Sequence, residues 1–209
     1  MNWEVALVNV SLLWILTTPH EFAHAWAATK LGDDTPLREG RVTLNPLAHV
    51  DWVGTLILPA LTSLLGGGFL GWGRAVNTNP FRLRGGLKGL ALVALAGPFS
   101  NILFAFILAI AAALSLRWIP SFAEYLTMGV RMSLYLAIFN LLPVPPLDGS
   151  KLLLAARLPA VIYQEIARFG FVFLIVALSI SDLGRWMSAG SWWGTRQIFE
   201  LVIPVFRLS

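Results

Sequence analysis

The sequence has 209 residues, of which 57% are hydrophobic and only 12% are charged, about half the charged fraction of an average soluble domain. This composition argues against a soluble globular protein and indicates a chain that lies in a bilayer. Cysteine is absent, which excludes disulfides and thiolate metal sites, so that any metal ligand must be His, Asp or Glu. The net charge of +4 comes from scattered basic residues, not from a clustered nucleic-acid-binding arm.

Four apolar stretches are long enough to cross a membrane as helices, which takes about 20 residues each. They cover residues 3–31, 87–116, 122–145 and 158–180, and a fifth stretch, residues 192–208, is of marginal length. The first has no basic leader, so we expect a helix of the mature protein and not a signal peptide. The predicted fold class is an all-α multi-pass membrane protein with about four to six membrane helices.

We expect a single membrane-embedded domain over residues 1–209, because the chain has no internal repeat and no separable soluble segment. Its catalytic core is expected at residues 3–158, with C-terminal membrane segments in residues 159–209. Two polar loops, residues 30–51 and 71–86, interrupt the apolar pattern, and residues 41–44 in the first are a candidate β-strand.

An HExxH motif, His20-Glu21-Phe22-Ala23-His24, lies inside the first apolar stretch. In a helix this spacing places both imidazoles on one face, one turn apart, where they can share a metal ion. The glutamate then lies within reach of a water molecule at the metal and can accept its proton. The alternative is that neighbouring groups merely satisfy these polar side chains. Because unpartnered ionisable groups are costly in an apolar core, we favour a functional site.

A catalytic zinc site needs a third protein ligand, and Asp148 is the carboxylate that stands out. It follows a stretch in which Pro143, Pro145 and Pro146 prevent a continuous helix. Irregular backbone at membrane depth is tolerated only inside protein or beside a water-filled cavity, so the surroundings of Asp148 favour a function. The plain alternative is that Asp148 caps a helix that begins at Ser150.

At this point the chain resembles the site-2 protease family of intramembrane metalloproteases. HEFAH and the NxxPxPxLDG pattern of residues 140–149 are similar to that family's two signatures, in the expected order and separation. Residues 45–51 (NPLAHVD) and 96–101 (AGPFSN) are similar to its short prokaryotic members. The chain has no room for the PDZ or CBS domain of larger members, so we expect no substrate selection by such domains.

The resemblance implies one Zn²⁺ per chain, with His20, His24 and Asp148 as its ligands. It implies that Glu21 is the general base and that Asn140 holds the substrate or stabilises the oxyanion. The His-His-Asp set itself favours zinc over other divalent metals.

His49 and Asp51 have two open interpretations. The resemblance suggests that they lie near the active site as substrate-binding or supporting residues. The plain alternative is a loop histidine beside Trp52, an aromatic residue at the membrane interface.

The membrane topology follows from the requirement that His20, His24 and Asp148 reach one metal ion. The helices that carry them should be parallel, with the helix of residues 87–116 antiparallel to both. Residues 53–70 then cannot cross the membrane once, and we predict a re-entrant hairpin with its bend at Pro59 or at the three glycines of residues 66–68.

This topology gathers most basic residues on one face, which the positive-inside rule identifies as cytoplasmic. We therefore expect a prokaryotic cell membrane protein whose active site lies nearer the cytoplasmic face. The residues on that face are Lys30, Arg38, Arg41, Arg74, Arg82, Arg84, Lys88, Lys151 and Arg157.

Two functions compete. The first is proteolysis of a transmembrane protein substrate, unwound locally because a helical peptide carbonyl is already hydrogen-bonded. The second is an ion transporter or channel that uses intramembrane His and Asp residues. Glu21 discriminates between them, because ion binding does not need the HExxH glutamate. A catalytically dead scaffold is disfavoured, since every signature residue is present. Besides substrate and bilayer we expect no nucleic-acid partner, and the sequence does not indicate an oligomeric state.

Overall fold

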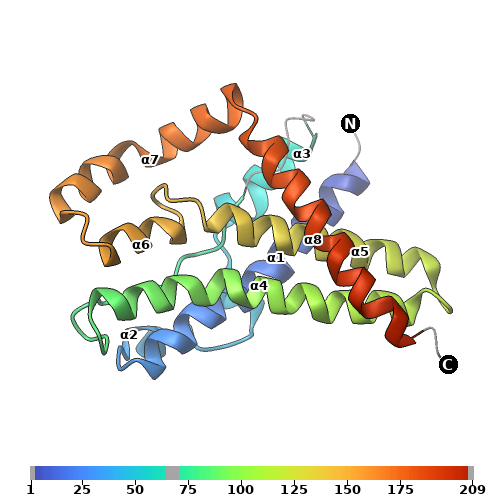
Figure 1. Ribbon diagram of the computed structural model, residues 1–209, viewed down its shortest axis with the longest axis horizontal. Coiled ribbons are helices and arrows are strands. Elements are labelled where there is room, and N and C mark those ends of the chain that lie inside the picture. Colours follow the sequence, from blue (N-terminus) through green and yellow to red (C-terminus); the bar gives the residue numbers. More distant parts are fainter. Residues whose placement is uncertain (1–2, 65–70, 207–209) are drawn as a thin grey trace. The chain divides into compact units, whose positions relative to one another are not determined.

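The computed structural model describes residues 3–64 and 71–206, and all the regular elements in these ranges are helices (Figure 1). The predicted all-α fold class is therefore confirmed. In chain order the elements are α1 (Trp3–Lys30), α2 (Thr35–Arg38), the 3-10 helix η1 (Pro46–His49), the π-helix η2 (Trp52–Ile57), α3 (Leu58–Leu64), α4 (Leu87–Ser115), α5 (Pro120–Asn140), α6 (Asp148–Ala155), α7 (Ala160–Ile180) and α8 (Leu183–Phe206).

Two helices of the described chain are both long and apolar enough to cross a membrane, α4 with a mean hydropathy of 2.1 and α7 with 1.8. The helix α1 coincides with a predicted span, but His20, Glu21 and His24 lower its hydropathy. The helix α5 ends at Asn140, earlier than the sequence suggested, because the prolines that follow cannot continue it. The predicted number of spans stays a prediction.

The prediction of a β-strand at residues 41–44 is wrong, since the structure has no strand there. Local side chains hydrogen-bond the backbone groups that would otherwise pair with a neighbouring strand. The ring Nε2 of His49 donates to the carbonyl of Thr43 at 2.8 Å, and the Thr43 hydroxyl accepts from the backbone N–H of Asn45 at 3.1 Å. Asn45 then caps η1, so the segment forms turns.

The chain divides into two compact units, Met1–Gly97 and Pro98–Ser209, with the boundary inside α4. In the first unit α2, α3, η1 and η2 all pack against α1. Glycines permit the closest approaches. A Cβ on Gly54 would lie 2.2 Å from the Trp72 indole, and one on Gly71 would lie 2.5 Å from the Leu13 side chain. The segment that starts at Gly71 therefore lies directly against η2 and α1.

Pro59 lies inside the continuous apolar helix that η2 and α3 form over residues 52–64, and not in a turn between two segments. It is therefore not the bend of a hairpin. The three glycines at residues 66–68 lie outside the described residues, so the re-entrant hairpin stays a prediction.

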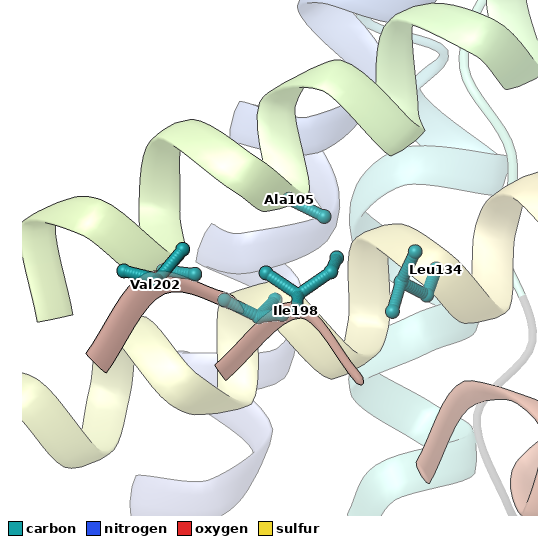
Figure 2. Packing of buried hydrophobic residues seen from close by; sticks show 6 residues of the cluster. Ala105, Leu134, Ile198 and Val202 are labelled. Atoms are coloured by element: carbon teal, nitrogen blue, oxygen red, sulfur yellow. The ribbon is translucent and has the colours of Figure 1, made fainter. Parts of the chain in front are cut away.

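In the second unit α5 and α8 pack along each other, and α4 contributes to the same apolar cluster. Figure 2 shows its labelled members, Ala105 from α4, Leu134 from α5, and Ile198 and Val202 from α8. Gly194 brings α8 close to α5, because a Cβ there would lie 3.1 Å from Leu134 Cδ1. Small residues at a helix interface are typical of packing in membranes.

Candidate metal centre

The HExxH residues lie together in α1, and all three are buried. The two imidazole Nε2 atoms of His20 and His24 are 3.0 Å apart, and the rings meet edge to face at 85°. Two nitrogens bound to one tetrahedral zinc would be about 3.3 Å apart, since each Zn–N bond is about 2.0–2.1 Å. The predicted one-face arrangement of the imidazoles is thus present, and its donors fit a shared ion.

The proton on His24 is fixed by α4. Its Nδ1 lies 2.7 Å from the Val93 carbonyl oxygen, and because a carbonyl can only accept, Nδ1 donates. Nε2 is then the unprotonated nitrogen, and its lone pair could bind a metal in the arrangement that histidine ligands usually show.

Gly97 has no side chain, and the two imidazoles occupy the space that a side chain would fill. A Cβ at this position would lie 2.3 Å from His24 Nε2 and 2.6 Å from His20 Cε1. The residues 96–101 that resemble the short prokaryotic members therefore include a direct neighbour of HExxH. The sequence alone favoured no such role; the signal available was a glycine directly before Pro98 inside an apolar helix.

Glu21 is held by an extended segment far along the chain. Its Oε2 accepts a hydrogen bond of 3.1 Å from the backbone N–H of Val76. The same segment passes close to α1, because a Cβ on Gly73 would lie 3.2 Å from Thr17 Cβ and 3.5 Å from Glu21 Cγ. One carboxylate oxygen of the general-base candidate is thus oriented by the protein backbone.

Asp148 lies in the second unit, as the first residue of α6, and is buried. The N-cap residue of α6 is Leu147, so the alternative in which Asp148 caps this helix is wrong. Lys151 Nζ lies 2.8 Å from Asp148 Oδ1, an ion pair across one helical turn. The preceding loop folds tightly, since a Cβ on Gly149 would lie 2.2 Å from the Leu141 carbonyl oxygen.

Asn140 is the last residue of α5 and is partly buried. Its side-chain Nδ2 donates to the Leu136 carbonyl at 3.0 Å, one turn back in the same helix.

His49 and Asp51 both bind the loops around them. His49 is fully buried, and its Nε2 donates to the Thr43 carbonyl. Burial lowers the pKa of His49, the Arg41 charge adds to this effect, and the Thr43 hydrogen bond opposes it. The Asp51 carboxylate accepts from the N–H groups of Val53 and Gly54 at 3.0 and 2.7 Å, and so caps η2. Both contacts are those of loop-building residues.

Comparison with known proteins identifies the family. The model of peptidase family M50 matches residues 117–178. YwhC of Bacillus subtilis, named as a candidate zinc metalloprotease, is 35% identical over 85% of this chain and 82% of its own. Rip2 of Mycolicibacterium smegmatis, named likewise, is 32% identical over 83% of this chain and 67% of its own. No solved structure matches the chain. The chain therefore belongs to peptidase family M50, the site-2 protease family, and is a zinc metalloprotease.

Proposed function

We propose that this zinc metalloprotease hydrolyses peptide bonds in or beside transmembrane segments of membrane proteins, with one zinc held by His20, His24 and Asp148. The observation that carries the proposal is the pair of buried imidazoles in α1 with Glu21 between them. In this proposal the buried carboxylate of Asp148 is the third ligand, because catalytic zinc sites use three protein ligands.

A zinc ion held by these residues would supply Lewis acidity, which polarises a carbonyl and makes bound water more acidic. Glu21 accepts the proton of the attacking water and transfers it to the leaving amine. The Val76 N–H donates to Glu21 Oε2 and orients the carboxylate. Lys151 pairs with Asp148 Oδ1 and orients that carboxylate. Asn140 holds the substrate or stabilises the oxyanion in this proposal.

The exposed apolar surface supports a multi-pass membrane location. Only 11% of the most apolar part of α7 is buried, and Phe173 and Ile180 are 60% and 82% exposed. A helix with so much exposed apolar surface requires a covering of lipid or protein. Site-2 proteases are membrane proteins, and we assign lipid to this surface.

Hydrogen bonds in the first unit support return of the chain to one membrane face between α1 and α4. The Leu31 carbonyl at the end of α1 accepts from the Arg84 N–H at 2.7 Å, and Asp34 forms an ion pair with Arg82. The start and the end of the apolar segment between these loops are also joined, because the Trp72 N–H donates to the Gly54 carbonyl at 2.9 Å. With the positive-inside rule, this face is cytoplasmic.

Metal content tests the ligand set. Purified His20→Ala, His24→Ala and Asp148→Ala variants should each lose zinc together with cleavage of a transmembrane peptide, because three ligands are needed to hold the ion. Lys88→Ala, a basic residue in the first turn of α4, serves as the control that should keep both. Full zinc occupancy in Asp148→Ala would remove that residue from the site.

A further inference from the structure

Arg41 is a buried cation to which the proposed chemistry assigns no role. Only 3% of its surface is exposed. Its Nη1 donates to the Ala48 carbonyl at 2.6 Å and its Nη2 donates to the Arg74 carbonyl. The guanidinium thus joins η1 to the extended segment that runs past Glu21. A planar fork of donors suits this double contact, which a single ammonium group cannot reproduce.

The segment of residues 72–76, which Arg41 contacts, has the two-residue hydrogen-bonding repeat of an extended chain. Its alternate N–H groups all bind the first unit: Trp72 donates to Gly54, Arg74 to His49 at 2.9 Å, and Val76 to Glu21 at 3.1 Å. In extended backbone the N–H and C=O groups of one residue point the same way, and those of the next point oppositely. A shift by one residue would therefore turn the Val76 N–H away from Glu21.

Arg74 is the residue that fixes this register. Its N–H is bound by the His49 carbonyl and its C=O by Arg41, so both backbone groups are held two residues before Val76. Burial lowers the pKa of Arg41; the negative charges of Glu21 and Glu39 oppose this effect and the charge of Arg74 adds to it. The arginine is thus coupled to Glu21 through the backbone and through their charges.

We propose that Arg41 is a positioning residue for proteolysis: it holds residues 72–76 in the register that presents the Val76 N–H to the Glu21 carboxylate. This inference rests on the proposed role of Glu21 as general base. It predicts that loss of the double carbonyl contact lowers turnover without weakening zinc or substrate binding.

The first test is Arg41→Lys in the full-length protein, with kinetics on a transmembrane peptide. The lysine keeps the charge but not the fork, so kcat should fall about 10- to 100-fold, as expected for a small displacement of a reacting group. KM and zinc content should stay within about twofold of the parent. The matched control is Arg84→Lys, because Arg84 donates to the Lys30 carbonyl away from this segment and should give parent kinetics.

A double-mutant cycle separates positioning from a merely structural role. The shorter carboxylate of Glu21→Asp cannot maintain the Val76 contact, so it should itself lower kcat. In the Glu21→Asp background, Arg41→Lys should then lower kcat by less than about twofold. An equal loss in both backgrounds, or an unchanged kcat for Arg41→Lys alone, overturns the proposal. An unchanged kcat for Glu21→Asp would overturn both this proposal and the proposed function. The first two outcomes overturn this proposal alone, so the two failures are distinguishable.

Val76→Pro provides a second route if Arg41→Lys does not fold. Proline is compatible with extended backbone and removes the N–H without altering Arg41. It should reproduce the loss of kcat with zinc retained. Parent turnover in this variant would overturn the proposal.

Discussion

Gly97 is a point of close approach between α4 and the two imidazoles. A methyl group there would overlap His24 Nε2, which the proposed site reserves for the metal. We predict that Gly97→Ala weakens zinc binding about 10- to 100-fold, the range seen when groups that support ligands are altered. Zinc affinity measured by competition with a chelator checks this. Gly184→Ala is the matched control, since a Cβ at Gly184 meets nothing within 4 Å. Parent zinc affinity in Gly97→Ala would contradict the packing argument.

His49 makes stability depend on pH. Its pKa in the folded protein lies below the ordinary 6.5 because burial disfavours the charged form. The unfolded state therefore binds a proton that the folded state rejects. Stability should fall as pH decreases below 6.5, with the loss complete only below the folded pKa.

Thermal unfolding between about pH 7.5 and 5, with zinc removed by a chelator, measures this effect. His49→Gln keeps an amide donor for the Thr43 carbonyl but does not titrate. It should show a shallower loss of stability towards acid than the parent. Equal slopes in the two proteins would show that His49 does not contribute.

At the scale of the elements, apolar length predicted the positions of α1, α4, α5 and α7 because a long uncharged run has few alternatives to a helix. The strand at residues 41–44 failed because turn-forming side chains outcompeted weak strand preference. The HExxH pair was predictable because its geometry is local to one helix. The contacts of Val76, Gly97 and Arg41 were missed because they join distant segments, and no local pattern encodes those.

The proposed re-entrant topology of the segment between the two polar loops can be tested by cysteine labelling. Leu37 and Phe81 flank the ion pair of Asp34 and Arg82 and are 56% and 99% exposed. Because the chain has no native cysteine, Leu37→Cys and Phe81→Cys are clean labelling sites. Both should react with a membrane-impermeant maleimide from the cytoplasmic side only. Reaction from opposite sides would mean that residues 53–70 cross the membrane once, against the re-entrant proposal.

At the scale of the whole molecule, the proposed site draws its residues from both halves of the sequence. The imidazoles and Glu21 belong to α1, and Asp148 belongs to α6. Three prolines prevent the loop before α6 from forming a helix. In the proposed site both signature motifs are needed to hold one zinc ion. An ion-conducting protein would need the ligands alone, whereas a protease also needs the carboxylate between the two histidines.

Glu21→Gln tests that difference most directly. The amide is nearly isosteric with the carboxylate but cannot accept a proton, while both imidazoles and Asp148 remain to hold the metal. Purified protein should keep its zinc and lose hydrolysis of a transmembrane peptide by about 100- to 10,000-fold, the usual contribution of general-base catalysis. Cleavage at the parent rate by zinc-loaded Glu21→Gln protein would contradict the account.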